Sequence, residues 1–360
     1  MTDTIHATIN GKPVSAPAGA TILEAARGAG IHIPVLCEHP ALEAAGACRV
    51  CLVEVGGSAK FAAACVAPLA KGAVIFTHSE RVLEARRTIV ELILASHPLE
   101  CFSCASNGKC LLQDVCYELG VEGSRFAGEG LPRPKTARGD GNPFLRRDMD
   151  KCILCGRCVR VCESHARYHA VDFMGRSGGA SVGPSPDGTL EESGCVFCGQ
   201  CAQVCPVGAL ADIPADGMGR AWETRGVKTV CPYCGVGCEI ILKVNERTGK
   251  IANVESDHTS AASFNRGRTC VKGRYAWGFV HSGERLTTPL IRENGSLRPA
   301  SWEEAIAKTA GELTGIRRER GADALGFFAS ARCTNEENYL MQRLAREAAG
   351  TNNVAHCAHL

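Results

Sequence analysis

The chain has 360 residues, enough for two to three ordinary domains, and its formal net charge of +2 argues against a nucleic-acid binder built on a basic face. Aromatic residues make up 5% of it, too few for rows of base-stacking side chains. The one extreme count is 22 cysteines. No signal sequence, twin arginine or apolar run of membrane-spanning length is visible, so we expect a soluble, cytoplasmic protein without a membrane span. Thiols in that compartment are more often metal ligands than disulfides.

The first domain is predicted over residues 1–78. An Asn-Gly pair at 10–11, between IHATI and KPVSA, predicts a β-hairpin. The sequence TILE at 21–24 is a capping box, and it begins a short helix that Gly28 or Gly30 ends. Further strands are expected at CLVEV, KFAAAC and AVIFT. Together these elements indicate a small α+β domain.

That domain carries its cysteines in the spacing Cys37-x10-Cys48-x2-Cys51-x13-Cys65. The spacing is a relative of the plant-type ferredoxin pattern, with a longer first gap. It predicts a [2Fe–2S] site, and a zinc site is the alternative on spacing alone.

The next segment, residues 79–140, is expected to begin with a helix from about Glu80 to Ser96. Its inner face is predicted to hold Val82, Ala85, Ile89 and Leu92. The helix leads into a second set of candidate ligands with the spacing His97-x3-Cys101-x2-Cys104-x5-Cys110. The spacing alone leaves open whether the histidine is a ligand or an ordinary helix cap. Cys116 lies in the helical sequence LLQDVCYELG and is interpreted as a packed, unligated thiol. A Gly-, Pro- and Arg-rich linker at 128–143 ends the segment.

Residues 141–217 contain an internal repeat, KCILCGRCVRVC and GCVFCGQCAQVCPVG, separated by a Gly/Ser/Pro segment at 176–188. Both runs follow C-x2-C-x2-C-x3-C, in which the fourth cysteine serves the other cluster. One [4Fe–4S] site is therefore predicted at Cys152, Cys155, Cys158 and Cys205, and a second at Cys195, Cys198, Cys201 and Cys162. The second run has the expected Pro206, whereas the first has Glu163 at that position. Zinc sites usually take separated cysteine pairs rather than triplets.

Residues 224–283 hold a fifth set, Cys231-x2-Cys234-x3-Cys238-x31-Cys270, in which Gly235 and Gly237 allow a tight fold around a cube. Lys272 follows two residues after the last cysteine and is compatible with an ordinary solvated lysine.

Residues 284–360 are predicted to begin an α/β domain that is incomplete. A capping box at 301–304 begins a helix with Ile306, Ala310 and Leu313 inward, and residues 324–330 form a buried-strand candidate. A second capping box at 334–337 begins a helix that Gly350 ends.

In the order of its five cysteine sets, the chain resembles the alpha subunit of soluble, NAD-linked molybdenum or tungsten formate dehydrogenases over essentially its whole length. The sequence segments that also carry this resemblance are DKCILCGRCVRVC, CVFCGQC, CPYCGVGC, CVKGRYAW and SARCTNEENYL. The part before about residue 220 also resembles the large iron–sulfur subunit of complex I and the N-terminal part of iron-only hydrogenases. The resemblance implies an α+β multidomain iron–sulfur protein. Its parts would be a β-grasp [2Fe–2S] ferredoxin, a one-His/three-Cys [4Fe–4S] segment that makes His97 a ligand, a ferredoxin-like domain with two [4Fe–4S] clusters, and the [4Fe–4S] domain of molybdopterin oxidoreductases.

The resemblance also implies a function. In the family, formate is oxidised at a Mo or W bis-molybdopterin guanine dinucleotide, and electrons pass through one [2Fe–2S] and four [4Fe–4S] clusters toward a flavin subunit that reduces NAD. Lys272 matches a lysine that relays electrons between cluster and pterin. The implied partners are flavin/NAD-binding and small [2Fe–2S] electron-transfer subunits, with no nucleic acid. No other catalytic residue is expected within the 360 residues.

The ending TNNVAHCAHL resembles the family sequence just before a metal-ligating cysteine or selenocysteine. We therefore expect that the chain is truncated at a selenocysteine UGA codon after Leu360 and is inactive alone. Two alternatives stay open. One is a non-catalytic electron-transfer subunit of a complex I-like, hydrogenase or bifurcating assembly, and the other is a zinc-stabilised interaction module.

Overall fold

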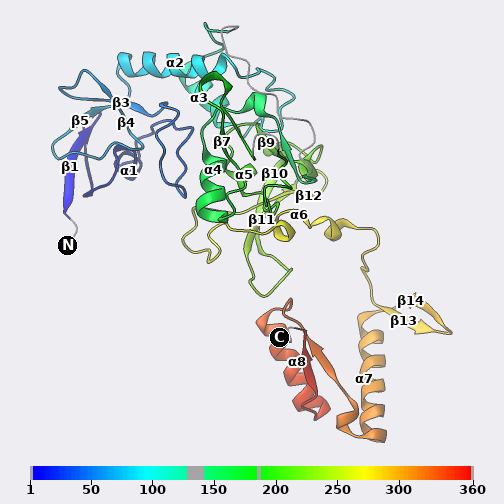
Figure 1. Ribbon diagram of the computed structural model, residues 1–360. Coiled ribbons are helices and arrows are strands. Elements are labelled where there is room, and N and C mark those ends of the chain that lie inside the picture. Colours follow the sequence, from blue (N-terminus) through cyan, green and yellow to red (C-terminus); the bar gives the residue numbers. More distant parts are fainter. Residues whose placement is uncertain (1–2, 128–141, 185–187, 358–360) are drawn as a thin grey trace. The chain divides into compact units, whose positions relative to one another are not determined.

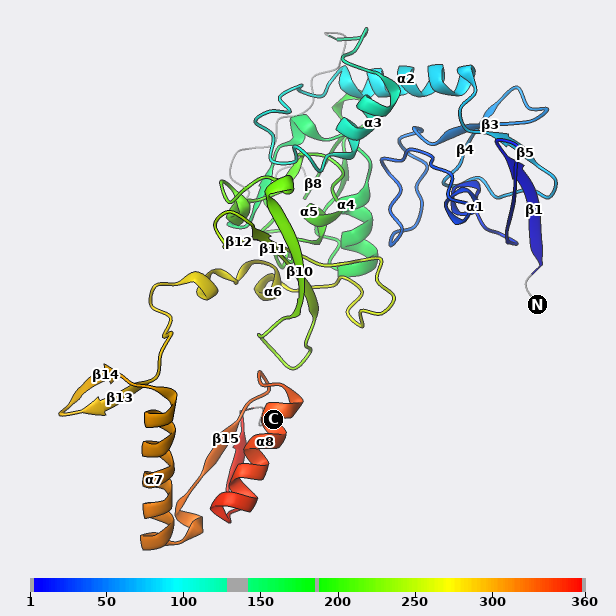
Figure 2. The same ribbon diagram turned by 180° about the vertical axis from the view of Figure 1, so that it is seen from behind.

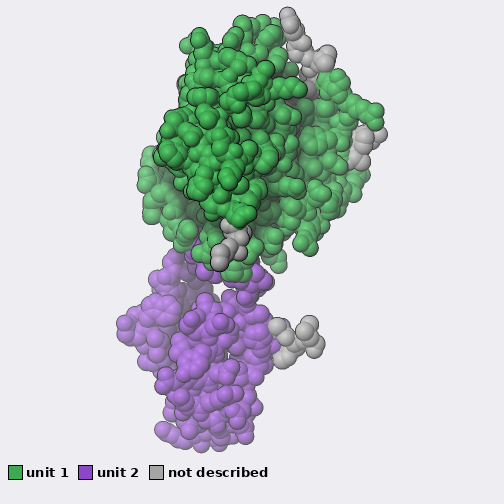
Figure 3. All heavy atoms as spheres, turned by 90° about the vertical axis from the view of Figure 1, so that its left-hand side faces the viewer, with its two compact units in different colours: residues 1–228, 241–275 green, residues 229–240, 276–360 purple. Residues whose placement is uncertain are grey.

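The computed structural model describes residues 3–127, 142–184 and 188–357. The chain divides into two compact units, one of residues 1–228 and 241–275 and one of residues 229–240 and 276–360 (Figure 3). The predicted linker falls almost wholly on residues outside the described ranges, as does part of the Gly/Ser/Pro segment within the repeat.

The first unit opens with a five-stranded sheet of order β2-β1-β5-β3-β4 (Figure 1). Its strands are β1 (Thr4–Ile9), β2 (Lys12–Pro17), β3 (Leu52–Val55), β4 (Phe61–Ala63) and β5 (Val74–Phe76). The predicted hairpin is confirmed: β1 pairs antiparallel with β2 through a turn in which Asn10 and Gly11 have φ of 52° and 78°. The predicted helix is confirmed as α1 (Ile22–Gly28), and Thr21 and Glu24 form its capping box.

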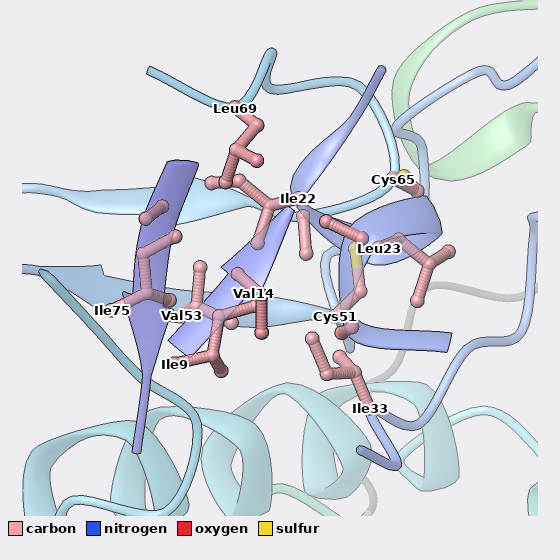
Figure 4. Close-up of a cluster of buried hydrophobic side chains, with 14 of the residues drawn as sticks. Ile9, Val14, Ile22, Leu23, Ile33, Cys51, Val53, Cys65, Leu69 and Ile75 are labelled. Atoms are coloured by element: carbon pink, nitrogen blue, oxygen red, sulfur yellow. The ribbon is translucent and has the colours of Figure 1, made fainter. Parts of the chain in front are cut away.

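The core of this domain lies between the sheet and α1. Ile9, Val53 and Ile75 have no exposed surface, and Leu23 is 2% exposed. Figure 4 shows these side chains directed toward a common centre, with two cysteines of the first set among them. Two of the four cysteines of the first set are therefore anchored in the packed core of the domain.

Two helices follow, α2 (Glu80–Leu94) and α3 (Leu111–Leu119). The predicted inner face of α2 is wrong in part, because Leu92 is 55% exposed. The buried stripe holds Val82, Arg86, Val90 and Leu94 instead. Arg86 can lie inside because its guanidinium donates to the carbonyl of Leu52, at 2.7 Å from Nη2. A hydrophobicity pattern places arginine outward and so misses this stripe.

The repeat forms the centre of the first unit, where α4 and α5 lie side by side (Figures 1 and 2). Two small antiparallel pairs, β6 with β9 and β7 with β8, frame these helices. The elements are β6 (Leu145–Arg147), η1 (Met149–Lys151), α4 (Arg157–Arg160), the π-helix η2 (Val161–Ala166), β7 (Asp172–Met174), η3 (Ser177–Gly179), β8 (Ser181–Gly183), α5 (Gln200–Val204), β9 (Leu210–Asp212) and η4 (Ile213–Ala215).

After the repeat the chain forms η5 (Ala221–Glu223) and a sheet of order β10-β11-β12. Its strands are β10 (Thr224–Val230), β11 (Glu239–Asn245) and β12 (Ile251–Glu255), and α6 (Val271–Tyr275) follows. Residues 229–240, between the main parts of β10 and β11, belong to the second unit.

The second unit continues with η6 (Gly278–His281), β13 (Leu290–Glu293), β14 (Ser296–Pro299), α7 (Trp302–Arg320), η7 (Ala322–Ala324), β15 (Phe327–Ala329), α8 (Asn335–Arg343), η8 (Leu344–Ala349) and β16 (Val354–His356). The parallel pairing of β15 with β16 agrees with the α/β prediction. Both predicted helix starts are confirmed, since Ser301 and Thr334 accept from the amides of Glu304 and Glu337. The carboxylate of Glu304 pairs with Arg298, so the first cap is not reciprocal.

The predicted burial in this unit is wrong in large part, although Leu325 of the predicted buried strand is 6% exposed. Ile306 is 61% exposed and Phe328, within the predicted buried strand, is 79% exposed. In the described part of the chain α7 has no buried residue. The reason is physical: an apolar face is buried only where a second element covers it, and the pair β15–β16 is too small to do so. None of the helices in the described ranges has the length and apolar character needed to cross a membrane.

Candidate cluster-binding sites

The four cysteines of the first set come from two places, since Cys37, Cys48 and Cys51 lie in the loop before β3 and Cys65 follows β4. Cys51 and Cys65 lie in the domain core, and the amide of Cys37 donates to Cys48 Sγ at 3.4 Å. The Cys65 thiol contacts those of both Cys37 and Cys51. Hydrogen bonds from the thiols of Cys48 and Cys65 lower the pKa of Cys37. Four neighbouring cysteine sulfurs are the type of donor that an iron–sulfur cluster needs.

The two cysteine runs of the repeat have nearly the same backbone. Leu154 and Phe197 stand at equivalent positions with φ of 54° and 56°. Their amides donate to the sulfurs of Cys152 and Cys195, each at 3.4 Å. Gly156 and Gly199 follow at φ of 68° and 70° and precede α4 and α5. This backbone turns the amides and thiols of each run toward the same interior.

Eight cysteines of the repeat line a single apolar cavity. Their side chains interact both within and between the two runs. Cys205 interacts with Cys152 and Cys155, and Cys158 interacts with these three and also with Cys201. Cys201 lies beside Cys162, Cys195 and Cys198. Burial raises the pKa of Cys158, Cys201 and Cys205, the last to about 12, so metal binding here must displace protons.

Among the described residues no group of three or more His, Cys, Asp or Glu side chains has a geometry that could hold a single metal ion. A cluster of several irons instead needs thiolates that stand apart around a cavity. The cysteines around the repeat cavity are arranged in this second way.

The third site lies on α2 and α3. His97 is half-buried three residues after α2, and its amide donates to the Leu94 carbonyl at 3.2 Å. Cys110 is buried directly before α3 and lies near Cys101 and Cys104. Cys116 is half-buried against the apolar cluster between α2 and α3, and burial raises its pKa to about 11. The environment of Cys116 is that of a packed thiol.

This segment rests directly on the loop after Cys205. The amide of Leu111 donates to the carbonyl of Pro206 at 2.9 Å. Gly208 packs so closely on Cys104 Sγ that a Cβ at that position would overlap the sulfur. The third site is therefore adjacent to the first [4Fe–4S] site of the repeat.

The structure does not bring the fifth set together within one unit. Cys231, Cys234 and Cys238 lie in the second unit, where the Cys231 amide donates to the Cys238 carbonyl at 2.8 Å. Cys270 lies in the first unit, exposed before α6, and Lys272 is exposed within α6. Their common role stays a prediction. The last three residues of the sequence ending, 358–360, lie outside the described ranges.

Sequence reasoning missed a buried ionic network at the end of β9. Asp212 accepts from Arg274 Nη2 at 2.6 Å, from Tyr275 Oη at 2.7 Å and from Asn253 Nδ2 at 3.0 Å. Arg274 is only 2% exposed, and burial raises the pKa of Tyr275. The network fastens α6 to the repeat. The part of the sequence that could have indicated this network is Gly-Arg-Tyr at 273–275, inside CVKGRYAW. The cysteine spacing draws attention to that segment only as a cluster-binding region.

The repeat also contains two pairs of polar residues that sequence reasoning passed over. Arg157 and Arg160 in the first run correspond to Gln200 and Gln203 in the second. Arg157 and Gln200 are buried at 5% and 3% exposure. An alignment of the two runs identifies these as the positions between the cysteines where the charge of the runs differs.

Comparison with known protein families agrees with this arrangement. The matching family models are the 2Fe-2S iron-sulfur cluster binding domain at residues 2–80, the NADH-ubiquinone oxidoreductase-G iron-sulfur binding region at 86–125, the 4Fe-4S dicluster domain at 151–209, the molybdopterin oxidoreductase Fe4S4 domain at 224–282 and the molybdopterin oxidoreductase family at 285–360. They confirm the expectation of both cluster types and of a molybdopterin-type family.

Curated relatives cover nearly all of this chain. The NADPH-Fe(3+) oxidoreductase subunit alpha of Geobacter sulfurreducens is 37% identical over 99% of the chain and 40% of its own length. A G subunit of the NADH-quinone oxidoreductase of Rhizobium meliloti is 36% identical over 97% and 40%. The putative formate dehydrogenase YrhE of Bacillus subtilis is 34% identical over 98% and 40%. The chain thus spans about two fifths of the length of these relatives.

A solved structure is similar as well. A chain of an NAD+-reducing [NiFe]-hydrogenase, in the H2-reduced state, superimposes with a TM-score of 0.54 at 32% sequence identity, covering 60% of this chain and 90% of that one. The relatives are oxidoreductases, and several are named as subunits. By its domain order and these relatives, the chain belongs to the iron–sulfur oxidoreductase family that includes the G subunits of NADH-quinone oxidoreductases and the formate dehydrogenase-like molybdopterin oxidoreductases.

Proposed function

We propose that this chain is the iron–sulfur electron-transfer part of a formate dehydrogenase alpha subunit that acts in the cytoplasm. When bound, iron–sulfur clusters store and pass single electrons, and a Mo or W bis-molybdopterin guanine dinucleotide in the full-length enzyme oxidises formate to CO2. The observation that carries the electron-transfer role is the arrangement of eight cysteines around one apolar cavity.

The proposed ligands follow the five sets. A [2Fe–2S] cluster in a β-grasp domain would be held by Cys37, Cys48, Cys51 and Cys65. Four [4Fe–4S] clusters would be held by His97, Cys101, Cys104 and Cys110; by Cys152, Cys155, Cys158 and Cys205; by Cys162, Cys195, Cys198 and Cys201; and by Cys231, Cys234, Cys238 and Cys270. The protein positions these donors and, around the apolar repeat cavity, excludes water from them, which would tune the reduction potentials of the clusters there.

Composition tests the first part of the proposal. Anaerobically purified protein should be brown and contain about 18 iron atoms and about 18 acid-labile sulfides per chain, from one two-iron and four four-iron centres. Zinc with little iron would contradict it and favour the interaction module.

Formate as the substrate rests on the sequence words shared with formate dehydrogenases and on the similarity to a putative member. In the full-length enzyme with its flavin and small [2Fe–2S] partner subunits, formate should bleach the clusters and reduce NAD. Lys272→Ala should slow that reduction without loss of the neighbouring cluster. Formate turnover equal to that of wild type in a fully loaded Lys272→Ala enzyme would contradict a relay role.

A second candidate is a non-catalytic electron-transfer subunit. It is favoured by the similarity to an NADH-quinone oxidoreductase G subunit and to a chain of an NAD+-reducing hydrogenase. This candidate predicts that NADH, with a flavin subunit present, reduces the clusters and that formate does not, in a protein free of Mo and W.

A further inference from the structure

The arginines of the first cysteine run donate hydrogen bonds to backbone carbonyls of the cysteine loop in the N-terminal domain. Arg160 Nη2 donates to the carbonyl of Cys37 at 2.6 Å and to the carbonyl of Cys155 at 3.2 Å. Its Nη1 donates to the carbonyl of Glu43. One guanidinium therefore touches a proposed ligand residue of the [2Fe–2S] site and one of the first [4Fe–4S] site.

Arg157 adds a second cation at the same place. It is 5% exposed and donates to the carbonyl of Glu38, the residue after Cys37, and to that of Val204 at 3.4 Å. The Glu38 carboxylate pairs with Arg27, and in the described residues no carboxylate forms an ion pair with Arg157. The negative groups that act most strongly on its charge are Cys155, then the Glu38 carboxylate, then Cys37. A buried cation without an acidic partner is costly unless other negative charge compensates it.

The equivalent positions of the second run are neutral. The Gln200 side-chain amide lies 2.9 Å from Thr269 Oγ1, and Gln203 hydrogen-bonds Ser256. The cations near the second run also differ from those of the first run, because they come from outside the run. Arg147 lies near Cys195, and Arg274, which packs on Gly199, has its charge paired with Asp212 at 2.6 Å. Between its cysteines the first run thus carries two positive charges, Arg157 and Arg160, where the second run carries two neutral glutamines.

Positive charge beside an iron–sulfur cluster favours reduction of the cluster. An iron–sulfur cluster with four thiolates is anionic and becomes more so when an electron arrives. Two cations held within hydrogen-bond reach of its ligand residues stabilise the reduced form, most strongly where water is excluded.

We propose that Arg157 and Arg160 form the electron-transfer junction between the [2Fe–2S] site and the first [4Fe–4S] site, and that their charges raise the reduction potentials of both. The proposal rests on the proposed function, namely that these cysteines hold clusters. In the step itself one electron leaves one centre and enters the other. The guanidinium groups stay protonated and are neither oxidised nor reduced, so both arginines are positioning residues.

The test uses the charge-neutral residues of the second run as replacements. Arg157→Gln, Arg160→Gln and Arg160→Lys are compared with wild type and with Arg176→Gln, an exposed arginine of the same domain. The readout is an anaerobic redox titration followed by EPR. At a fixed potential, each Gln variant should lower the reduced-to-oxidised ratio of the [2Fe–2S] signal and of one [4Fe–4S] signal about tenfold, equal to about 59 mV for one electron. In the Gln variants, the other EPR signals should titrate as in wild type. In Arg160→Lys and Arg176→Gln, all signals should titrate near the wild-type potentials.

The outcomes separate this proposal from the proposed function. A wild-type protein without cluster signals would contradict the proposed function itself. Wild-type clusters with unchanged potentials in both Gln variants would overturn only the junction. An Arg160→Lys variant that shifts as far as Arg160→Gln would overturn the charge argument. Loss of clusters in all three junction variants would mark the arginines as structural and would overturn it too.

Discussion

The two halves of the repeat have the same backbone around their sulfurs and then diverge. In the second run α5 ends at Val204, and Cys205 is extended before Pro206. In the first run Glu163 replaces that proline, and the helix continues as a π-helix to Ala166. Proline cannot continue a helix, so one residue decides which path the chain takes.

That continuation has a structural consequence. It carries His165 to the N-terminal domain, where His165 Nε2 lies 2.8 Å from the carbonyl of Ala41. The second half meets α6 instead, through Gly199 beneath Tyr275. The same backbone conformation around the cysteines thus occurs twice. The residues between and after the cysteines determine which part of the protein each half contacts.

The largest expected effect comes from single cysteines of the repeat. Cys155→Ala and Cys205→Ala should remove the same [4Fe–4S] EPR signal and about four irons per chain, because the fourth cysteine of each run serves the other cluster. Cys198→Ala should remove a different signal. If Cys205→Ala matched Cys198→Ala instead, the crossed assignment would be wrong.

The ionic network beside the second half should give the next largest effect. Asp212→Asn leaves Arg274 buried without its counter-charge, so we expect a loss of about 3–5 kcal/mol of stability. Asp216→Asn is the matched control, since its partner Arg146 is 46% exposed and exposed pairs contribute about 1 kcal/mol or less. Urea midpoints of the two loaded variants measure the contrast. Equal midpoints would contradict it.

The equivalent glycines should differ by a smaller amount. Both have positive φ, so alanine costs backbone strain of about 1–3 kcal/mol at either position. At Gly199 the new Cβ also overlaps the hydroxyl of Tyr275, which Asp212 holds in place. At Gly156 it meets the ring of Phe173, which is 50% exposed and can turn aside. We expect Gly199→Ala to lower the urea midpoint clearly more than Gly156→Ala, and the reverse order would show that the two halves are not constrained as described.

A cysteine outside both halves should have the smallest effect. Cys116→Ser should leave the iron content and every EPR signal unchanged, because its half-buried thiol packs among apolar side chains. His97→Ala, on the same segment, should alter one [4Fe–4S] signal. Loss of a [4Fe–4S] signal in Cys116→Ser, with His97→Ala unchanged, would exchange their roles.

Short segments of the sequence determined many of the local structures of this protein. The Asn10-Gly11 hairpin, the caps at Thr21 and Thr334 and the spacing of the repeat cysteines each depend on residues a few positions apart. Hydrogen bonds within a turn, a cap or a ligand loop are local, so the sequence states them directly.

Only the tertiary structure decided which side chains are covered and what they face. Arg86 is buried because the Leu52 carbonyl lies within reach, and Ile306 is exposed because no element of the described residues covers it. Arg160 meets Cys37 across 123 positions of sequence, and Arg274 meets Asp212 across 62. Burial and charge compensation depend on neighbours that distant parts of the chain supply, and no local pattern contains them.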